Sequence, residues 1–163
     1  MKIRRRHAAL IAALLVAIDL LVKNRVETAL PFQEVVPVIP FLSFYKTYNE
    51  GVAFSFLTFL DDRLLVALTV VIMVFIIWLW KRTPRYRWLS QLGFAAIIGG
   101  AIGNLVDRSF LGHVVDFILL HAGNWSFAVF NLADSFITIG AALIIIEEIF
   151  GLNKRPGKKQ PQS

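Results

Sequence analysis

Two long stretches without a charged residue limit what this chain can fold into. Residues 64–80 and 88–106 contain no Asp, Glu, Lys or Arg, and residues 8–30 and 128–150 are apolar apart from a few charged positions. Each stretch is close to the roughly 20 residues that an α-helix needs to cross a bilayer. Hydrophobic residues make up 57% of the chain, more than is usual for a soluble globule. The sequence therefore predicts an all-α membrane protein with a bundle of four transmembrane helices.

The basic residues indicate how this bundle is oriented. Most of the 17 Lys and Arg residues fall in three clusters, at the N-terminus, at residues 81–87 and near the C-terminus, which alternate with the apolar stretches. Such clusters concentrate on the cytoplasmic side, so both termini are expected there, and no nucleic-acid partner is expected. A cleaved signal peptide is the alternative for the first apolar stretch, but Asp19 and Lys23 interrupt it.

The segments between the apolar stretches are expected to form a small β part on the outer side. Residues 31–63 contain three prolines near their start and many β-branched and aromatic residues, which favour short strands and turns. Residues 107–127 resemble two strands joined by a turn near Gly123. We therefore expect an extracytoplasmic β cradle within a single domain at residues 1–152, followed by a polar cytoplasmic tail at 153–163.

Polar side chains inside the apolar stretches are candidates for function, because a charge at bilayer depth is costly. With a helical rise of about 1.5 Å per residue, the polar groups of three helices reach one level, roughly 22–24 Å above the inner edge. These groups are Asp19 and Lys23 in the first helix, Asn104, Asp107 and Arg108 in the third, and Asn131 and Asp134 in the fourth. Asp116 follows soon after the third helix and is able to fold onto the same level.

The two aspartates Asp116 and Asp134 suggest acid–base chemistry. Two carboxyl groups in one partly dry pocket do not both ionise readily, so the pair holds a single proton. The ionised partner can take a proton from water as the water attacks a peptide carbonyl, and the protonated partner can donate to that carbonyl and later to the leaving amine. This chemistry needs no metal and no cofactor, and the pair titrates as a unit, so neither aspartate is given a fixed role.

Most of these residues also have a purely structural interpretation. Asp107 could pair with Arg108 at a helix end, Asp19 with Lys23 between helices, Asp134 could cap the fourth helix, and Asp116 could face solvent from a strand. Glu147 and Glu148, at the inner end of the fourth helix, are expected to be solvated.

Other classes of function stay open at this point. A small proton- or cation-coupled transporter could use Asp19 and Lys23 as a relay, although the sequence has no internal repeat. A non-catalytic assembly subunit would tolerate replacement of both Asp116 and Asp134. Ser135 has no lysine near it in sequence to form a Ser–Lys pair. The histidines lack metal-ligand spacing, and with no cysteine in the chain no metal site is expected.

Five short blocks carry a resemblance to a known family. They are "DLLVK" at 19–23, "NEGVAFS" at 49–55, "GGAIGNLVDR" at 99–108, "VVDF" at 114–117 and "FNLADS" at 130–135. In this order and at these intervals, the blocks make the chain resemble lipoprotein signal peptidase, the bacterial type II signal peptidase.

The resemblance implies an intramembrane aspartyl peptidase with Asp116 and Asp134 as its catalytic pair. The positions it implies as lining or bracing the substrate pocket are Asp19, Lys23, Asn49, Gly51, Asn104, Arg108 and Asn131. The implied substrate is a prolipoprotein that carries diacylglycerol on a cysteine and is cut just before it. We accordingly expect a monomer in contact with membrane lipids, spanning the bacterial inner membrane several times with its site near the extracytoplasmic face. The segment that begins "GVAFSFLTFLDD" is expected to act as a lid.

Overall fold

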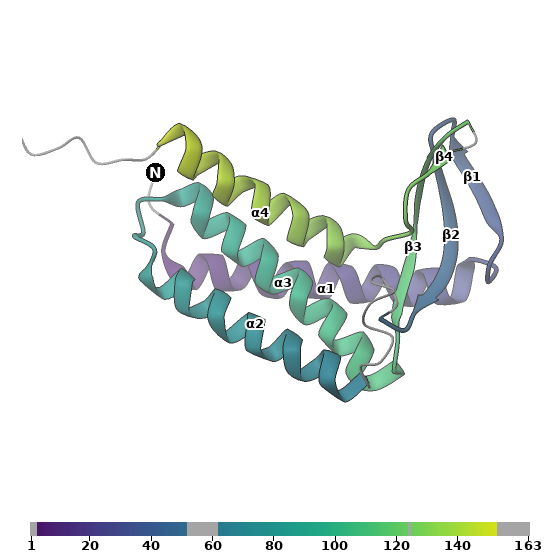
Figure 1. Ribbon diagram of the computed structural model, residues 1–163, viewed down its shortest axis with the longest axis horizontal. Helices are drawn as coiled ribbons and strands as arrows, with labels where there is room; N and C mark the ends of the chain where they lie inside the picture. Colours follow the sequence, from purple (N-terminus) through teal and green to yellow (C-terminus); the bar gives the residue numbers. More distant parts are fainter. Residues whose placement is uncertain (1–2, 52–61, 124, 153–163) are drawn as a thin grey trace, which may run out of the picture.

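The computed structural model describes residues 3–51, 62–123 and 125–152, and it is mostly helical. Its long helices are α1 (Arg5–Ala29), α2 (Asp62–Arg82), α3 (Trp88–Leu111) and α4 (Leu132–Phe150). They lie side by side along most of the molecule, with a small sheet across one end (Figure 1). This confirms the predicted helical fold with a small β part. The proposed lid falls mainly on residues outside the described ranges.

Two helix boundaries differ from the predicted ranges for local physical reasons. α3 continues to Leu111, where Gly112 adopts a left-handed conformation with φ of 77° and ends the helix. Asp107 and Arg108 therefore lie on the helix and do not belong to the outer segment. α4 begins only at Leu132, because the side chain of Asn131 caps it and residues 128–131 are not helical.

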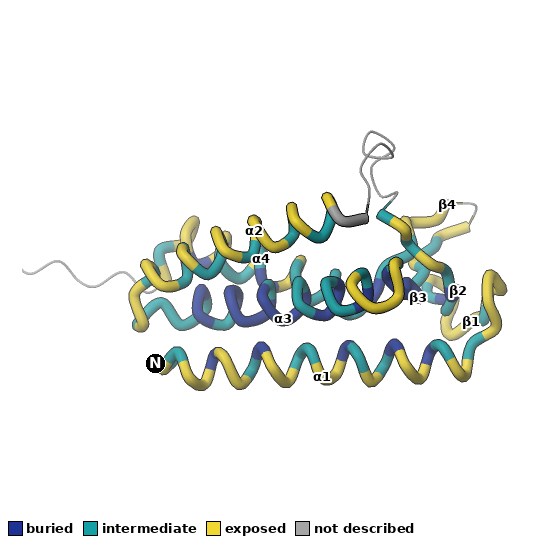
Figure 2. The backbone as a smooth tube through the Cα atoms, turned by 90° about the horizontal axis from the view of Figure 1, so that it is seen from below, coloured by how far each residue is buried: buried dark blue, intermediate teal, exposed yellow. Residues whose placement is uncertain are grey.

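α3 forms the centre of the bundle and packs against each of the other three helices. Its residues are the most buried of the four helices (Figure 2). Close packing against α1 depends on Gly99 and Gly103, where an added Cβ would lie 3.0 Å from the Ala12 carbonyl oxygen and 2.4 Å from Asp19 Oδ2. Small residues at this spacing allow two helix backbones to approach each other.

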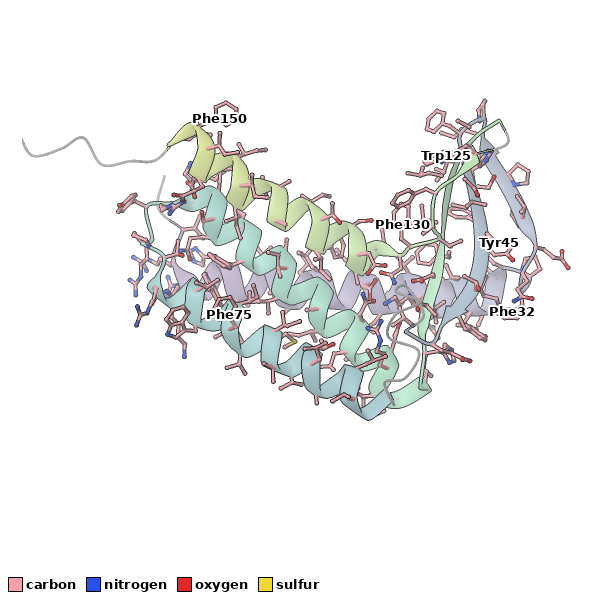
Figure 3. The ribbon with its side chains drawn as sticks, viewed as in Figure 1. Phe32, Tyr45, Phe75, Trp125, Phe130 and Phe150 are labelled. Atoms are coloured by element: carbon pink, nitrogen blue, oxygen red, sulfur yellow. The ribbon has the colours of Figure 1, made fainter. Side chains whose placement is uncertain are left out.

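The outward faces of the bundle are apolar. Phe75 on α2 is 54% exposed and Phe150 on α4 is 69% exposed, and both project away from the bundle (Figure 3). By length and composition, α2 (from Leu64) and α3 are able to cross a membrane. An apolar surface of this extent would be unfavourable in water and is suited to contact with lipid.

The four-stranded sheet has the order β1 (Val35–Ile39), β2 (Leu42–Asn49), β3 (Val114–Ala122) and β4 (Trp125–Ser126), and neighbouring strands are antiparallel. This agrees with the strands predicted for the two outer segments. β3 joins the sheet to the bundle, because it follows α3 directly in the chain and contacts both α3 and α1.

β3 places one carboxylate where the sheet meets the helices. Val115 and Phe117 pack with Val26 of α1 in a hydrophobic cluster. Neighbouring side chains of a strand point to opposite faces, so Asp116 points away from this cluster. In the antiparallel register Asp116 lies opposite Thr47 of β2, close to the strand end at Asn49.

The end of the bundle farthest from the sheet also contains a buried carboxylate. Glu147 of α4 is 2% exposed and accepts hydrogen bonds from the backbone N–H and the hydroxyl of Ser90, at the start of α3. Arg87 bonds Glu148, whose side chain is largely exposed. The prediction that both glutamates are solvated is therefore wrong for Glu147, which ties α4 to the first turn of α3.

Candidate active site

A buried lysine holds together the ends of three helices that lie nearest the sheet. Lys23 Nζ lies 2.8 Å from Asp19 Oδ2 and 2.8 Å from Asp107 Oδ2, and the three side chains are at most 5% exposed. Asp19 Oδ1 also accepts from the backbone N–H of Ala133 at 2.9 Å, and Asp107 Oδ2 accepts from that of Val115 at 3.3 Å. One cation and two carboxylates thus connect α1, α3, α4 and β3.

The Asp19–Lys23 pair was predicted, whereas the role of Asp107 was not. The sequence suggested that Asp107 pairs with Arg108, its neighbour in the chain. The structure instead directs Asp107 to Lys23, which lies on another helix. The side chain of Arg108 forms no hydrogen bond or ion pair with any residue in the described parts of the chain. The sequence singled out this helix turn by the i, i+4 spacing of Asn104 and Arg108 and by the block "GGAIGNLVDR".

Asp116 and Asp134, the two predicted catalytic residues, lie in one hydrogen-bonded network. Asp116 is 2% exposed, so the alternative that it faces solvent is wrong. Its Oδ1 accepts from Asn131 Nδ2 at 2.6 Å and its Oδ2 from Asn49 Nδ2 at 3.0 Å. Asp134 Oδ1 accepts from Asn104 Nδ2 at 2.7 Å. Three asparagines therefore position the two carboxylates.

Asn131 is the residue that links the two aspartates. The side-chain oxygen of Asn131 accepts from the backbone N–H of Asp134 at 3.0 Å. The backbone N–H of Asn131 donates to Asp134 Oδ2 at 3.3 Å, which completes a capping box on α4. Asn131 is thus the N-cap of α4 and Asp134 is its N3 partner, so the alternative that Asp134 serves only as the cap is wrong, since Asp134 also accepts from Asn104. Since Asn131 Nδ2 also bonds Asp116, capping α4 fixes both carboxylates relative to each other.

The lysine determines which way the Asn104 amide faces. Lys23 Nζ donates to Asn104 Oδ1 at 3.0 Å, and Asn131 Nδ2 donates to the same oxygen at 3.2 Å. Because an ammonium has only donors, it selects the amide oxygen and leaves the amide nitrogen to face Asp134. The supporting residues Asp19, Lys23, Asn104 and Asn131 are thus all brought to the site.

Gly51 acts on the site through Asn49. Its φ of 95° is in the left-handed region, which glycine adopts without strain, and its backbone N–H donates to Asn49 Oδ1 at 2.9 Å. This bond occupies the amide oxygen and turns the Asn49 nitrogen toward Asp116. The turn at the end of β2 therefore helps to position that carboxylate.

Burial changes the acidity of Asp116. The pKa of the Asp116 carboxyl is raised to about 6, mainly because burial removes the water around it. The negative charge of Asp134 contributes to the rise, while the hydrogen bonds from Asn49 and Asn131 oppose it. A carboxyl group that keeps its proton into this range can serve as an acid beside an ionised partner. In the described ranges no three His, Asp or Glu side chains are grouped as a metal site would require.

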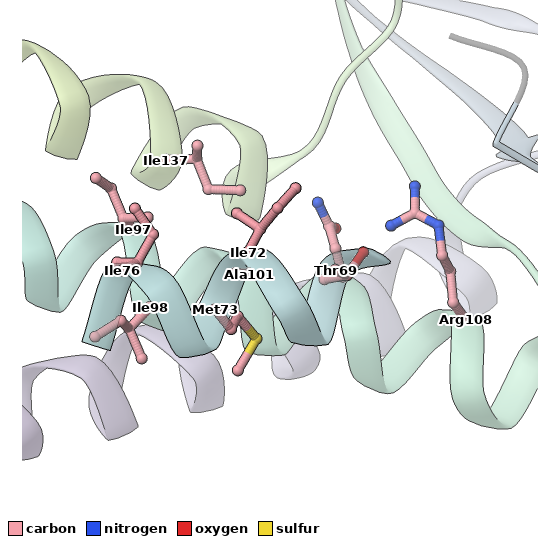
Figure 4. A pocket seen from close by; sticks show the side chains of 10 residues that line it. Thr69, Ile72, Met73, Ile76, Ile97, Ile98, Ala101, Arg108 and Ile137 are labelled. Atoms are coloured by element: carbon pink, nitrogen blue, oxygen red, sulfur yellow. The ribbon is translucent and has the colours of Figure 1, made fainter. Parts of the chain in front are cut away.

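Arg108 lies apart from the carboxylates, in a cavity between α2, α3 and α4. The cavity has a volume of about 200 Å³, and Arg108 lies toward one end of it with Ile76, Ile97 and Ile98 toward the other (Figure 4). Asn104 also lines this cavity, which connects Arg108 to the site. The hydroxyl of Ser135 donates to the Asn131 carbonyl at 3.0 Å, so it has a structural bond and no lysine partner.

The comparison with known families decides the assignment. A family model described as Signal peptidase (SPase) II matches residues 11–150. The chain belongs to the signal peptidase II family. This match contains every predicted site residue, from Asp19 to Asp134. A protease family is therefore established for the chain, and the comparisons give the transporter alternative no support.

Individual relatives of this signal peptidase II member agree. The chain is 53% identical over 136 residues to a lipoprotein signal peptidase of Sinorhizobium fredii, covering 83% of this chain and 82% of the relative. It is 46% identical over 153 residues to a lipoprotein signal peptidase of Mesorhizobium japonicum, covering 94% and 91%. The similarity therefore extends over most of both proteins.

Solved structures confirm the fold of this signal peptidase II member. One structure described as a bacterial membrane enzyme matches with a TM-score of 0.83 at 29% identity, over 98% of this chain and 97% of that one. A second with the same description matches with a TM-score of 0.81 at 30% identity, over 91% and 96%. The arrangement of helices and sheet is thus shared with bacterial membrane enzymes.

Proposed function

We propose that this chain is an aspartic endopeptidase that removes signal peptides from diacylglyceryl-modified prolipoproteins. It cuts the peptide bond just before the lipid-modified cysteine. The observation that carries the proposal is the bridge through Asn131, which joins two carboxylates of different environment, in a chain that belongs to a signal peptidase family. Asp116 is buried, whereas Asp134 is half-buried on the capped end of α4.

The proposed reaction uses a single proton that Asp116 and Asp134 share, so that one carboxyl is ionised and the other is protonated. The ionised carboxylate removes a proton from water while the water oxygen bonds to the scissile carbonyl carbon, and the other carboxyl donates a hydrogen bond to the carbonyl oxygen. The tetrahedral intermediate then collapses, the C–N bond breaks, and the amine of the modified cysteine leaves with a proton from the pair. Lys23 and the asparagines act before this step, by fixing the carboxylates in position.

The proposed membrane placement is multi-pass in the bacterial inner membrane, with all four helices spanning and both termini inside. The sheet and the two aspartates then lie near the extracytoplasmic face. In support, exposed basic side chains gather at the end of the bundle away from the sheet, where the N-terminus also lies (Figure 1). These residues are Arg4, Arg6, Lys81, Arg82 and Arg85. The proposal includes membrane lipids as neighbours and a monomer as the working unit.

Cleavage by the purified protein tests the proposed substrate. The protein in detergent is given a diacylglyceryl-modified precursor and, in parallel, the same precursor without the lipid. Mass spectrometry of the products is expected to show a cut immediately before the cysteine in the lipidated form only. Equal cleavage of the two forms, or a cut at another bond, would contradict the proposal.

Single introduced cysteines test the placement, because the chain has none of its own. Glu34→Cys lies beside β1 and Arg85→Cys lies between α2 and α3, and both positions are exposed. A membrane-impermeant maleimide applied to cells with a permeable outer membrane is expected to label Glu34→Cys but not Arg85→Cys. The reverse labelling pattern would contradict the proposed topology.

A further inference from the structure

Cavities of two kinds reach the site within the described part of the chain. Asp134 lines a cavity of about 420 Å³ together with apolar side chains of α4 and the sheet, among them Leu120, Phe127 and Phe130. The cavity beside Arg108 is also mainly apolar. Asp116 instead lines a cavity of about 310 Å³ that is more polar. The surroundings of Asp116 are therefore more polar than those of Asp134.

The polar cavity is formed by the end of β2 and the segment before α4. Thr47, Asn49 and Glu50 contribute its polar side chains, and Asp116 lies where it meets the site. None of the described residues that line it is basic. Glu50 is exposed, so its carboxylate gives this entrance a negative charge.

The wall of this cavity is held in place by several contacts of Tyr48. Its hydroxyl donates to Glu27 Oε2 at 3.0 Å, and its ring lies 4.0 Å from the ring of His113 and 4.7 Å from that of Phe32, measured between centroids. The nearby Lys46 is buried and engaged by Glu27, with its Nζ donating to the Glu27 carbonyl at 3.0 Å. It therefore does not neutralise Glu50 at the entrance.

The substrate of the proposed function has three parts that meet at the scissile bond, two of them apolar and one polar. The signal peptide and the diacylglyceryl chains are apolar, whereas the polypeptide that follows the modified cysteine is polar and extends into water. Apolar parts gain free energy in the apolar cavities, and a polar chain keeps its hydrogen bonds only in a polar, open one. Of the three cavities described above, the one beside Asp116 has the most polar lining and is the most open.

We infer that the cavity between the end of β2 and residues 128–129 binds the substrate residues that follow the modified cysteine. Within it, Glu50 favours basic and disfavours acidic side chains at those positions. The inference rests on the proposed function and adds to it a subsite and a residue that determines specificity. It also gives the substrate a direction, with the released signal peptide on the Asp134 side and the mature chain on the Asp116 side.

The test compares three lipidated precursors that differ only in the two residues after the cysteine, which are both Lys, both Gln or both Glu. Attraction of Lys and repulsion of Glu by one exposed carboxylate are each modest, so kcat/KM for the Lys form is expected to exceed that for the Glu form by about 2- to 30-fold at low salt. Glu50→Gln is expected to bring this ratio close to one, and Glu50→Lys to invert it. The matched control Glu34→Gln, at an exposed glutamate away from the cavity, is expected to keep the wild-type ratio.

A ratio that is the same in wild type and Glu50→Gln would overturn the assignment of Glu50. A photoreactive residue placed second after the cysteine is expected to crosslink near Thr47 or Val129, and crosslinking to Thr138 or Ile139 would overturn the direction of binding. The Gln precursor separates this inference from the proposed function. If wild type does not cut it, the proposed function fails; if wild type cuts it but shows no charge preference, only the inference fails.

Discussion

Replacement of Lys23 by methionine tests how much the buried charges contribute to stability. Methionine has a similar length but no charge, so Asp19 and Asp107 would remain as two buried carboxylates without their cation. Removing one partner from a buried, hydrogen-bonded ion pair costs about 3–5 kcal/mol. For a chain of this size that corresponds to a fall in the unfolding temperature of roughly 6–20 °C.

Thermal unfolding in detergent, followed by intrinsic tryptophan fluorescence, measures this effect. The triple variant Lys23→Met, Asp19→Asn, Asp107→Asn removes all three charges and is expected to recover at least half of the lost stability, because no carboxylate is then left uncompensated. It is not expected to recover cleavage, since Asn104 loses the cation that orients its amide. If Lys23→Met unfolds at the wild-type temperature, the network is not a source of stability and the reasoning is refuted.

Three further predictions concern single groups. Asn131→Ser keeps a capping oxygen but loses the side-chain N–H that bonds Asp116. Its free energy of unfolding is expected to stay within about 1 kcal/mol of the wild-type value, while its cleavage rate falls at least tenfold. Wild-type activity in this variant would exclude a positioning role for Asn131. Burial raises the pKa of Asp116 to about 6 from an ordinary value of 3.8, so its contribution to stability is greatest below about pH 4 and is lost as the pH rises through 6. The free energy of unfolding of wild type is therefore expected to fall between pH 4 and 7, and that of Asp116→Asn to fall less. Glu147→Ala leaves the donors of Ser90 unsatisfied and is expected to cost about 1–3 kcal/mol in chemical denaturation, whereas the exposed control Glu148→Ala is expected to change little.

The sequence alone was sufficient to predict the helices and to single out Asp116 and Asp134 as the candidate pair. Long uncharged stretches have few structural alternatives, and a carboxylate such as Asp134 within one is costly enough to require a reason. Asp19 and Lys23 were also predicted to pair, since four residues on one helix bring two side chains together. These predictions rest on local spacing or on composition, which a sequence displays directly.

Contacts between distant segments were not predictable in the same way. Asp107 meets Lys23 only because α3 packs against α1, and spacing along the chain favoured its neighbour Arg108 instead. Glu147 is buried because α4 runs beside the start of α3, which no local pattern indicates. The sequence also left open whether Asp134 or Asn131 caps α4, and the structure shows that Asn131 is the N-cap.

The direct test of the central claim is the single-turnover cleavage rate of a diacylglyceryl-modified precursor by Asp116→Asn and by Asp134→Asn. Each variant keeps the size of the side chain but loses the ability to exchange a proton. With unfolding temperatures confirming that both variants are folded, each rate is expected to fall by at least about 10²–10⁴-fold. A folded variant of either aspartate that cleaves at a rate close to wild type would contradict the account.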